Sequence, residues 1–272
     1  MPKKIVALDA RLIGKDNTGD TSYWTGLVRG LAALDSDLHF LLFSNAPKPS
    51  EVPDNPRFQW IEMQSSRSRW WSLLRFPLAA RRMRAKALHV QYNLSPLVPH
   101  GGITTVHDVS FYADPDWFRP QDRLVLQRFV PPSCRRADKV ITVSEFSKGE
   151  ISKHISGLDG KIVVTHNACG DDVQKMSRDY AISLIEQELG HTGPFCLAVG
   201  TRWPRKNLQL AMDAMGLLPD SVPHKLLLTG KSGWGEEELN NRVVPAGYVT
   251  RPLLNALYSA ADAYLAPAHY EG

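Results

Sequence analysis

The sequence has few cysteines and no long hydrophobic run. Its three cysteines, Cys134, Cys169 and Cys196, are odd in number and widely spaced among 272 residues, which indicates neither a disulfide framework nor a zinc site. The longest apolar runs, such as Leu226–Leu228, are far shorter than the ~20 residues of a membrane-spanning helix. The amino terminus also lacks the apolar core of a signal peptide. These absences predict a cytoplasmic globular protein.

Acidic residues are absent from one stretch of the chain. Between Met63 and Leu88 there is no Asp or Glu, whereas seven Lys or Arg residues occur there; the rest of the chain holds 25 basic and 28 acidic residues. Basic residues mixed with Trp and Leu, as here, suit an anionic membrane surface. A helix that packs on the core and exposes its arginines gives the same pattern. A nucleic-acid patch is the least favoured interpretation, because no recognised nucleic-acid module accompanies it.

Short apolar strands alternate with amphipathic helices along the whole chain, which predicts parallel strand pairing and an α/β fold in two units. The predicted strands are Lys4–Ala10, Phe40–Phe43, Phe58–Met63, Ala87–Tyr92, Ile103–Val106, Val140–Val143, Lys161–Thr165, Phe195–Val199, Lys225–Thr229, Val243–Val249 and Ala263–Ala266. The predicted helices are Thr21–Leu34, Leu73–Lys86 (entered or bent near Pro77), Gln121–Arg136 (broken or kinked at Pro131-Pro132), Glu145–Ile155, Ala181–Leu189, Leu208–Met215, Glu236–Asn240 and Leu253–Ala260. We expect domains at 1–175 and 190–272.

The second predicted unit contains only four strands, and the sequence stops at Glu271-Gly272 just after the last of them. Ligands of open α/β sheets bind outside the carboxyl ends of the strands. We therefore expect this domain to be incomplete and the chain to be a fragment.

Two loops of the first unit hold candidate site residues. The loop Gly14–Thr21 precedes a helix, whose N-terminus favours phosphate, but it lacks the dinucleotide-binding glycine spacing and also fits a simple turn. His107 follows a predicted strand and can exchange a proton with a bound hydroxyl near neutral pH. Its neighbour Asp108 is expected to favour the protonated imidazole. A structural, hydrogen-bonded histidine is the alternative.

Two loops of the second unit hold further candidates. The segment Gly200–Asn207 lies between a strand and a helix and carries three cations, which suits a diphosphate clamp that works without a metal. Solvated loop charge is the alternative. Glu271, after the last strand, is suited to hold sugar hydroxyls. Gly230-Lys231-Ser232 is not a P-loop, because Lys225 stands where that motif needs a glycine.

Taken together, these segments resemble the retaining glycosyltransferases of family 4, which have the two-domain GT-B fold. The matching segments occur in the family's order and are Thr105–Phe111, Ala137–Lys148, Gly200–Leu208, Ala246–Val249 and Leu257–Gly272. The resemblance implies two Rossmann-like parallel-sheet domains. The N-terminal one would lie on the acceptor side, and the C-terminal one, incomplete here, would bind the nucleotide-sugar.

The resemblance also implies roles for individual residues. His107 matches the histidine placed beside the transferred sugar, and Glu271 matches the first of two glutamates, which contacts that sugar. The second glutamate would fall at position 279. Gly19 matches the glycine that approaches the donor phosphates, whereas Thr21 replaces the family's second glycine and Asp20 adds an acid beside it.

Four further positions match the family's donor-binding residues. Arg205 and Lys206 match a basic pair at the diphosphate, and Tyr248 and Val249 lie where the family lines the nucleotide base. With the resemblance, a peripheral membrane helix for a lipid-linked acceptor becomes the favoured interpretation of the basic stretch. Its membrane patch would include Arg81, Arg82 and Arg84.

The implied reaction transfers a sugar, with retention, from a GDP-mannose-like, dTDP- or UDP-sugar donor to a glycan or lipid-linked acceptor in surface polysaccharide or lipopolysaccharide synthesis. No cofactor, metal or nucleic-acid partner is expected. The protein would be cytoplasmic and peripheral at the inner face of the plasma membrane. Two alternatives stay open: a truncated, non-catalytic fragment that binds nucleotide or membrane, and a sugar-nucleotide epimerase or phosphorylase of the same fold.

Overall fold

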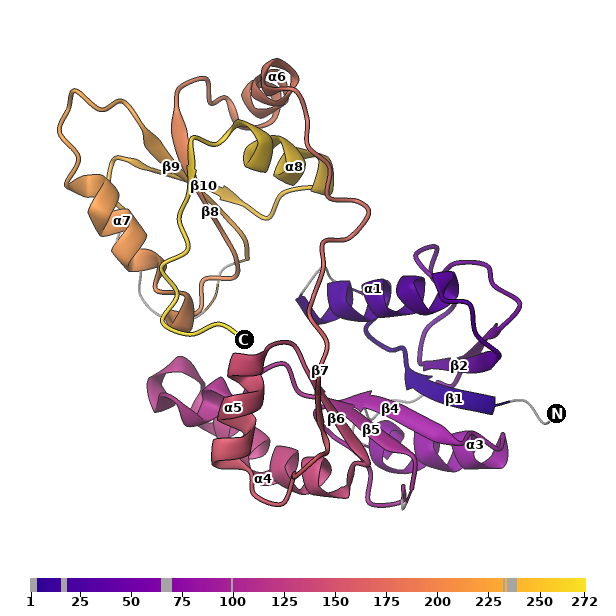
Figure 1. The fold of residues 1–272 in the computed structure, drawn as a ribbon. Coiled ribbons are helices and arrows are strands. Elements are labelled where there is room, and N and C mark those ends of the chain that lie inside the picture. Colours follow the sequence, from indigo (N-terminus) through magenta and orange to yellow (C-terminus); the bar gives the residue numbers. More distant parts are fainter. Residues whose placement is uncertain (1–3, 16–18, 65–69, 99, 232, 234–238) are drawn as a thin grey trace. The chain divides into compact units, whose positions relative to one another are not determined.

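Figure 1 shows the computed structural model, which describes residues 4–15, 19–64, 70–98, 100–231, 233 and 239–272. The chain divides into a first unit, Met1–Ala168, and a second unit, Cys169–Glu271. Each unit is built on a sheet whose described strands pair in parallel. Parallel sheets need helical crossovers between strands, and the alternation in the sequence supplies them.

The first unit has a seven-stranded sheet in the order β3-β2-β1-β4-β5-β6-β7. Its strands are β1 (Lys4–Asp9), β2 (Leu38–Ser44), β3 (Phe58–Glu62), β4 (Ala87–Gln91), β5 (Gly102–Thr105), β6 (Lys139–Thr142) and β7 (Ile162–Val164). Its helices are α1 (Gly19–Ala33), the π-helical turn η1 (Trp71–Arg75), α3 (Phe76–Arg82), the 3-10 turns η2 (Ser110–Tyr112) and η3 (Pro115–Trp117), α4 (Pro120–Arg136) and α5 (Glu145–His154).

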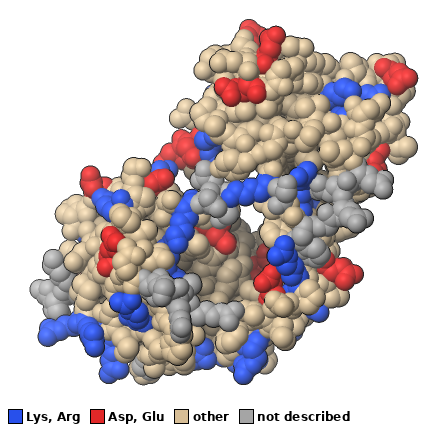
Figure 2. Space-filling view, turned by 180° about the vertical axis from the view of Figure 1, so that it is seen from behind, with Lys and Arg blue, Asp and Glu red and all other residues tan. Residues whose placement is uncertain are grey.

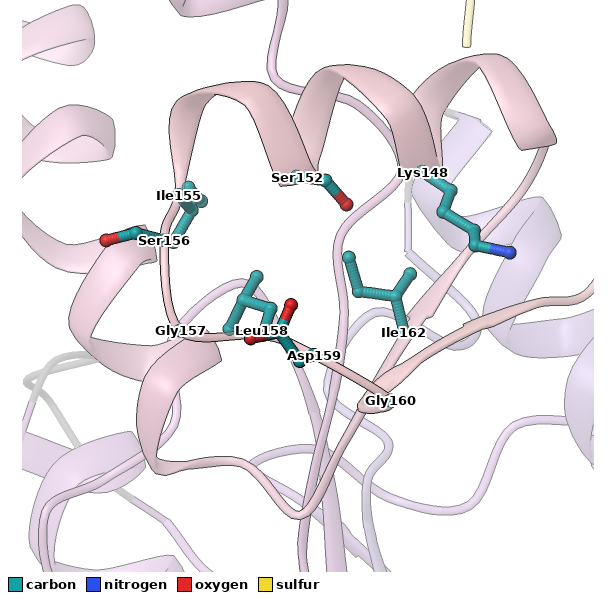
Figure 3. Close-up of a pocket in the computed structure, with 9 residues that line it drawn as sticks. All are labelled: Lys148, Ser152, Ile155, Ser156, Gly157, Leu158, Asp159, Gly160 and Ile162. Atoms are coloured by element: carbon teal, nitrogen blue, oxygen red, sulfur yellow. The ribbon is translucent and has the colours of Figure 1, made fainter.

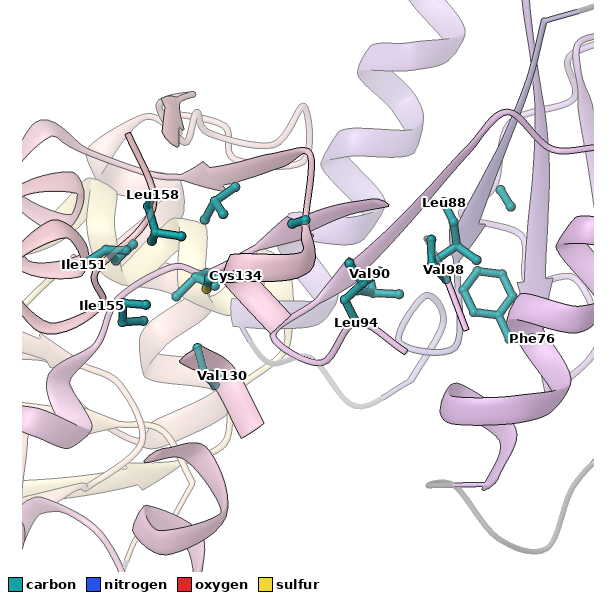
Figure 4. Close-up of a cluster of buried hydrophobic side chains, with 14 of the residues drawn as sticks. Phe76, Leu88, Val90, Leu94, Val98, Val130, Cys134, Ile151, Ile155 and Leu158 are labelled. Carbon is teal, nitrogen blue, oxygen red and sulfur yellow. The ribbon is translucent and has the colours of Figure 1, made fainter. Parts of the chain in front are cut away.

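Two hydrophobic clusters cover the two faces of this sheet. Alternate residues of a strand point to opposite faces, so Leu8 packs with Trp24 of α1, whereas Ala7 packs with the cluster that includes Phe76 of α3 and Ile151 of α5. Figure 4 shows side chains of this second cluster. Because both faces of the sheet are covered, polar residues lie at its edge, beyond the carboxyl ends of the strands.

Two proline-containing segments differ from the prediction. The expected helix 73–86 is a π-helical turn followed by α3, with Pro77 in the first turn of α3, and it stops at Arg82 because Arg84 adopts a left-handed φ of 60°. The predicted helix 121–136 is confirmed as α4, which runs from Pro120 to Arg136, and the proline pair within it does not break the helix. Pro131 lies in the helix face that is buried against the core, and this packing offsets the lost main-chain hydrogen bond.

The second unit has a four-stranded sheet in the order β10-β9-β8-β11. Its strands are β8 (Phe195–Val199), β9 (Lys225–Thr229), β10 (Val243–Gly247) and β11 (Ala263–Tyr264), and its helices are α6 (Arg178–Leu189), the 3-10 turn η4 (Pro204–Lys206), α7 (Leu208–Gly216) and α8 (Arg251–Ala260). Helix α6 shares a hydrophobic cluster with α8. The predicted helix 236–240 falls mainly on residues 234–238, outside the described part of the chain.

Candidate functional site

The carboxyl edge of the first unit brings together polar residues from three separate segments. His107 lies just beyond β5, Gln91 is the last residue of β4, and Asp20 is in the first turn of α1, the helix that follows β1. β1, β4 and β5 are neighbours in the sheet, and parallel neighbours end at the same edge. This geometry assembles a site from positions that are far apart in the sequence.

His107 is enclosed by aromatic rings and one carboxylate. The ring of Tyr23 lies edge-on at a centroid distance of 4.6 Å and that of Tyr92 at 6.1 Å, and Nε2 is 3.8 Å from Oδ1 of Asp20. Burial lowers the pKa of His107, and the nearby charges of Asp20 and Asp108 only partly oppose this. The expected preference for the protonated form is therefore wrong: the imidazole is neutral at pH 7.

Asp108 does not point its carboxylate at the imidazole. Its Oδ1 accepts hydrogen bonds from the backbone N–H and the hydroxyl of Ser110, at 2.8 and 2.6 Å. The Asp108 side chain is therefore engaged with Ser110 rather than with the imidazole of His107. The carboxylate nearest His107 comes instead from Asp20, 87 positions earlier in the chain.

A second polar layer lies directly beneath this edge. The hydroxyl of Thr105 is 3.0 Å from the Tyr23 hydroxyl and 2.8 Å from Nε2 of the buried His89. Burial lowers the pKa of His89 to about 4 and raises that of Tyr23. Both groups are thus neutral, and they hold α1 against the ends of β4 and β5. The sequence analysis did not identify Tyr23 or Gln91 as site residues. Gln91 could have been found, because it is a polar residue at the end of an otherwise apolar strand.

Gly19 is the first residue of α1, and packing does not require a glycine at this position. A Cβ built there would meet no atom of the described residues within 4 Å, and its φ is not positive. The protein itself therefore does not require a glycine at this position. The approach of a ligand to the backbone at this helix N-terminus stays a prediction.

In the second unit, the predicted cations and the predicted carboxylate come together. Arg205 and Lys206 lie in η4, after the carboxyl end of β8, and Glu271 follows the neighbouring strand β11. The Glu271 carboxylate is 3.3 Å from the Arg205 guanidinium and 2.5 Å from Nζ of Lys206. Two cations converge on one anion at the edge where open α/β sheets bind ligands.

Main-chain contacts fix the position of this basic turn. Arg205 donates to the carbonyl of Tyr270 at 2.8 Å and its own carbonyl accepts from the N–H of His269 at 2.9 Å. Asn207 ends the turn with a left-handed φ of 50° and donates to the carbonyl of Pro267 at 3.2 Å. The segment after β11 is thereby held on the cations by backbone as well as by charge.

Tyr248 and Val249 follow β10 but differ in exposure. Val249 is buried in the core of the second unit, so its backbone rather than its side chain is available to a ligand. The Tyr248 ring is 54% exposed and lies 5.7 Å from the ammonium of Lys231. Lys231, which follows β9, adds a further cation to this edge. Among the described residues, no group of His, Cys, Asp and Glu is arranged to hold a metal.

A separate hollow of about 540 Å³ lies between α5 and the turn before β7 (Figure 3). It is lined at the amino end of β7, opposite the edge that carries His107, and it contains none of the predicted site residues. Its Lys148 pairs with Glu145 at 3.1 Å. We therefore assign the site to the carboxyl edges and not to this hollow.

The basic stretch forms an exposed surface around α3. Arg81, Arg82 and Arg84 are exposed, as are the apolar side chains of Trp70 (55%) and Leu78 (42%). In Figure 2, Lys and Arg side chains gather along the lower edge of the first unit, and no Asp or Glu is seen along that edge. Arg67 and Arg69 of the same stretch lie outside the described residues. No helix in the described part of the chain is long and apolar enough to cross a bilayer.

The two parallel α/β sheets are those of a GT-B-like fold. The crystal structure of Anabaena Alr3699/HepE in complex with UDP and glucose has a TM-score of 0.67 at 16% identity, over 98% of this chain and 74% of that chain. WaaG, a glycosyltransferase involved in lipopolysaccharide biosynthesis, has a TM-score of 0.67 at 12% identity, over 98% and 75%. At such identities the likeness shows the fold alone.

Sequence comparison identifies the family. The profile of Glycosyltransferase Family 4 matches residues 19–172, more than half of the chain, and the protein therefore belongs to glycosyltransferase family 4. O-antigen chain mannosyltransferase B of Escherichia coli is 31% identical over 183 residues, 62% of this chain and 48% of that protein. O-antigen chain mannosyltransferase RfbU of Salmonella typhimurium is 26% identical over 197 residues, 69% and 51%. The chain spans about half the length of these curated relatives. The predicted family and fold class are confirmed.

Proposed function

We propose that this protein transfers a sugar, with retention of configuration, from a nucleoside-diphosphate sugar to an acceptor hydroxyl. The observation that carries the proposal is the convergence of Arg205 and Lys206 on the Glu271 carboxylate beside the end of β8. Cations placed there would stabilise the negative charge that develops on the departing diphosphate. They would do so without a metal.

The other candidate residues have compatible roles. His107, neutral because it is buried, would contact the transferred sugar as a hydrogen-bonding group and not as a cation. Glu271 would exchange its cationic partners for sugar hydroxyls when the donor diphosphate occupies the clamp. The departing phosphate would accept the acceptor's proton, so no protein nucleophile is required. Gly19 would allow the donor phosphates to approach the backbone of α1.

The names of the relatives support mannose as the transferred sugar and an O-antigen or lipopolysaccharide glycan as the product. The half-exposed ring of Tyr248 and the backbone of Val249 would receive the nucleotide base. The crystal structure of HepE is a complex with UDP-glucose, and the donors tested below therefore include both a guanine and a uracil nucleotide. We propose a glycan or lipid-linked acceptor.

The deciding experiment incubates the 272-residue protein with radiolabelled GDP-mannose, UDP-glucose or a dTDP-sugar and with lipid-linked glycan acceptors. Transfer of label with an unchanged anomeric configuration, read by NMR of the product, is the expected result. Release of an isomerised donor would instead identify an epimerase, and phosphate-dependent release of a sugar phosphate would identify a phosphorylase. Donor binding in calorimetry without turnover would identify a non-catalytic nucleotide-binding fragment.

We further propose that the exposed surface around α3 docks on the anionic inner face of the plasma membrane. The triple variant R81E/R82E/R84E should lose binding to phosphatidylglycerol-containing vesicles by at least about a hundredfold, since each cation near such a surface contributes about 1 kcal/mol. Vesicle co-sedimentation at low and at high salt measures this. The exposed lysines of K139E/K153E/K175E provide a control with the same change in net charge. Equal loss in both triple variants, or in neither, would contradict a local docking surface.

A further inference from the structure

Asp20 is held in a defined orientation by a chain of hydrogen bonds that begins in the core. The indole N–H of the buried Trp24 donates to Oε1 of Gln91 at 2.9 Å, and Nε2 of Gln91 donates to Oδ1 of Asp20 at 2.7 Å. An indole nitrogen can only donate, so it fixes which end of the Gln91 amide faces Asp20. The amide N–H₂ therefore points at the carboxylate and donates a hydrogen bond to it.

The imidazole of His107 has a nitrogen that lacks a hydrogen-bond partner among the described residues. Its Nε2 is buried and has no hydrogen-bond partner among the described residues, and it lies 3.8 Å from the same Oδ1 of Asp20. This separation exceeds a hydrogen bond, but such contacts are commonly long before a substrate binds. The Asp20 side chain is 52% exposed, so it has room to close the gap.

No other described group is placed to serve Nε2. From α1, the hydroxyl of Tyr23 is engaged with Thr105 at 3.0 Å. From the end of β4, the Tyr92 hydroxyl bonds to the backbone of His107 and Asp108. The Asp108 carboxylate is bonded to Ser110. Asp20 is thus the described acid that lies nearest to this nitrogen, at 3.8 Å.

We propose that Asp20 is a positioning residue for His107. Its carboxylate accepts the Nε2–H of the imidazole, and this fixes the ring orientation and the tautomer. The other ring nitrogen, Nδ1, then carries a lone pair and is the atom that accepts a hydrogen bond from a substrate hydroxyl. This role rests on the proposed function, whereas the Asp20–His107 pairing itself does not. Asp20, the acid that stands between Gly19 and Thr21, would then have a role in orienting His107.

The pairing is tested first in the unaltered protein, without turnover. Long-range ¹⁵N–¹H NMR spectra at pH 7.5 should show His107 with its hydrogen on Nε2. A titration followed at the His107 ring should then show a lower pKa in D20N than in the wild type, because the substitution removes a nearby negative charge. The control is D122N, which also removes an acid from the first turn of a helix, in this case α4, and it should leave the His107 titration unchanged.

Kinetics then test the role. With the donor that proves active, D20N should lower kcat by about tenfold with little change in the donor KM, as expected for loss of an oriented proton-exchanging group. A His107 that carries its hydrogen on Nδ1, or that titrates identically in D20N and wild type, overturns the proposal. If no donor is turned over, the proposed function fails while the spectra still decide the pairing.

Discussion

Replacing Lys206 by methionine should lower kcat/KM for sugar transfer by about a thousandfold. The substitution keeps the length of the side chain and removes a cation that lies 2.5 Å from the Glu271 carboxylate at the proposed diphosphate site. Removing one preorganised charge-stabilising group from an active site typically costs 10²- to 10³-fold in rate. The affinity for the free nucleoside diphosphate is a separate quantity. It should fall by about tenfold to a hundredfold, because a hydrogen bond to a charged group is lost.

Initial-rate kinetics and calorimetry with the nucleoside diphosphate measure the two effects separately. K225M is the matched control: Lys225 is a lysine of the same unit, at the amino end of β9, where its ammonium bonds the carbonyl of Asn241. It should retain wild-type turnover and affinity. A K206M protein that binds the nucleotide as tightly as wild type would show that the basic turn does not hold the diphosphate.

Mild acid should destabilise the first unit through His89, and replacing this histidine should remove the effect. Burial lowers the pKa of His89 to about 4 in the folded protein, whereas an unfolded histidine titrates near 6.5. Between these values the unfolded chain binds a proton that the folded chain does not, so stability falls as the pH falls. The stabilisation that comes from keeping His89 neutral is fully present above pH ~6.5. The free energy of unfolding is lower by about 2 kcal/mol at pH ~5 and by about 3 kcal/mol near pH ~4.

Urea unfolding of wild type and H89Q at pH 7 and pH 5 provides the measurement. Glutamine can keep a hydrogen bond to Thr105 without titrating, so the stability of H89Q should change about 2 kcal/mol less between the two pH values. H100Q, at an exposed position, should behave as wild type. Each protein is compared with itself, so a general loss of stability in H89Q does not affect the outcome. If the free energy of unfolding falls equally between pH 7 and pH 5 in wild type and H89Q, His89 is not the group that causes the loss of stability in acid.

Much of the fold followed from periodicity. Apolar strands alternating with amphipathic helices predicted two parallel α/β units, and strands β8 (Phe195–Val199) and β9 (Lys225–Thr229) begin and end at the predicted residues. The predicted helix 121–136 corresponds to α4, but the proline pair does not break it, because Pro131 is buried in the face that packs on the core. The prediction extended α3 beyond Arg82, because the left-handed turn at Arg84 has no marker in the sequence.

The site divides in a similar way. The candidate residues His107, Arg205, Lys206 and Glu271 stand in short segments that follow strands, and the sequence proposes them from residue type and position alone. The convergence of Glu271 on a turn 65 residues earlier depends on β11 pairing with β8. No local pattern records which strands become neighbours in a sheet.

The sequence by itself therefore determined the family and the α/β class and located the candidate site segments, because these depend on residue type and short spacing. Only the tertiary structure decided which residues act together. It turned Asp108 away to Ser110, brought Asp20 to His107 through Gln91, and buried His89 beneath them. The physical reason is that charge and hydrogen bonding act over a few ångströms in space, and parallel strand order brings residues within that range that are far apart in the chain.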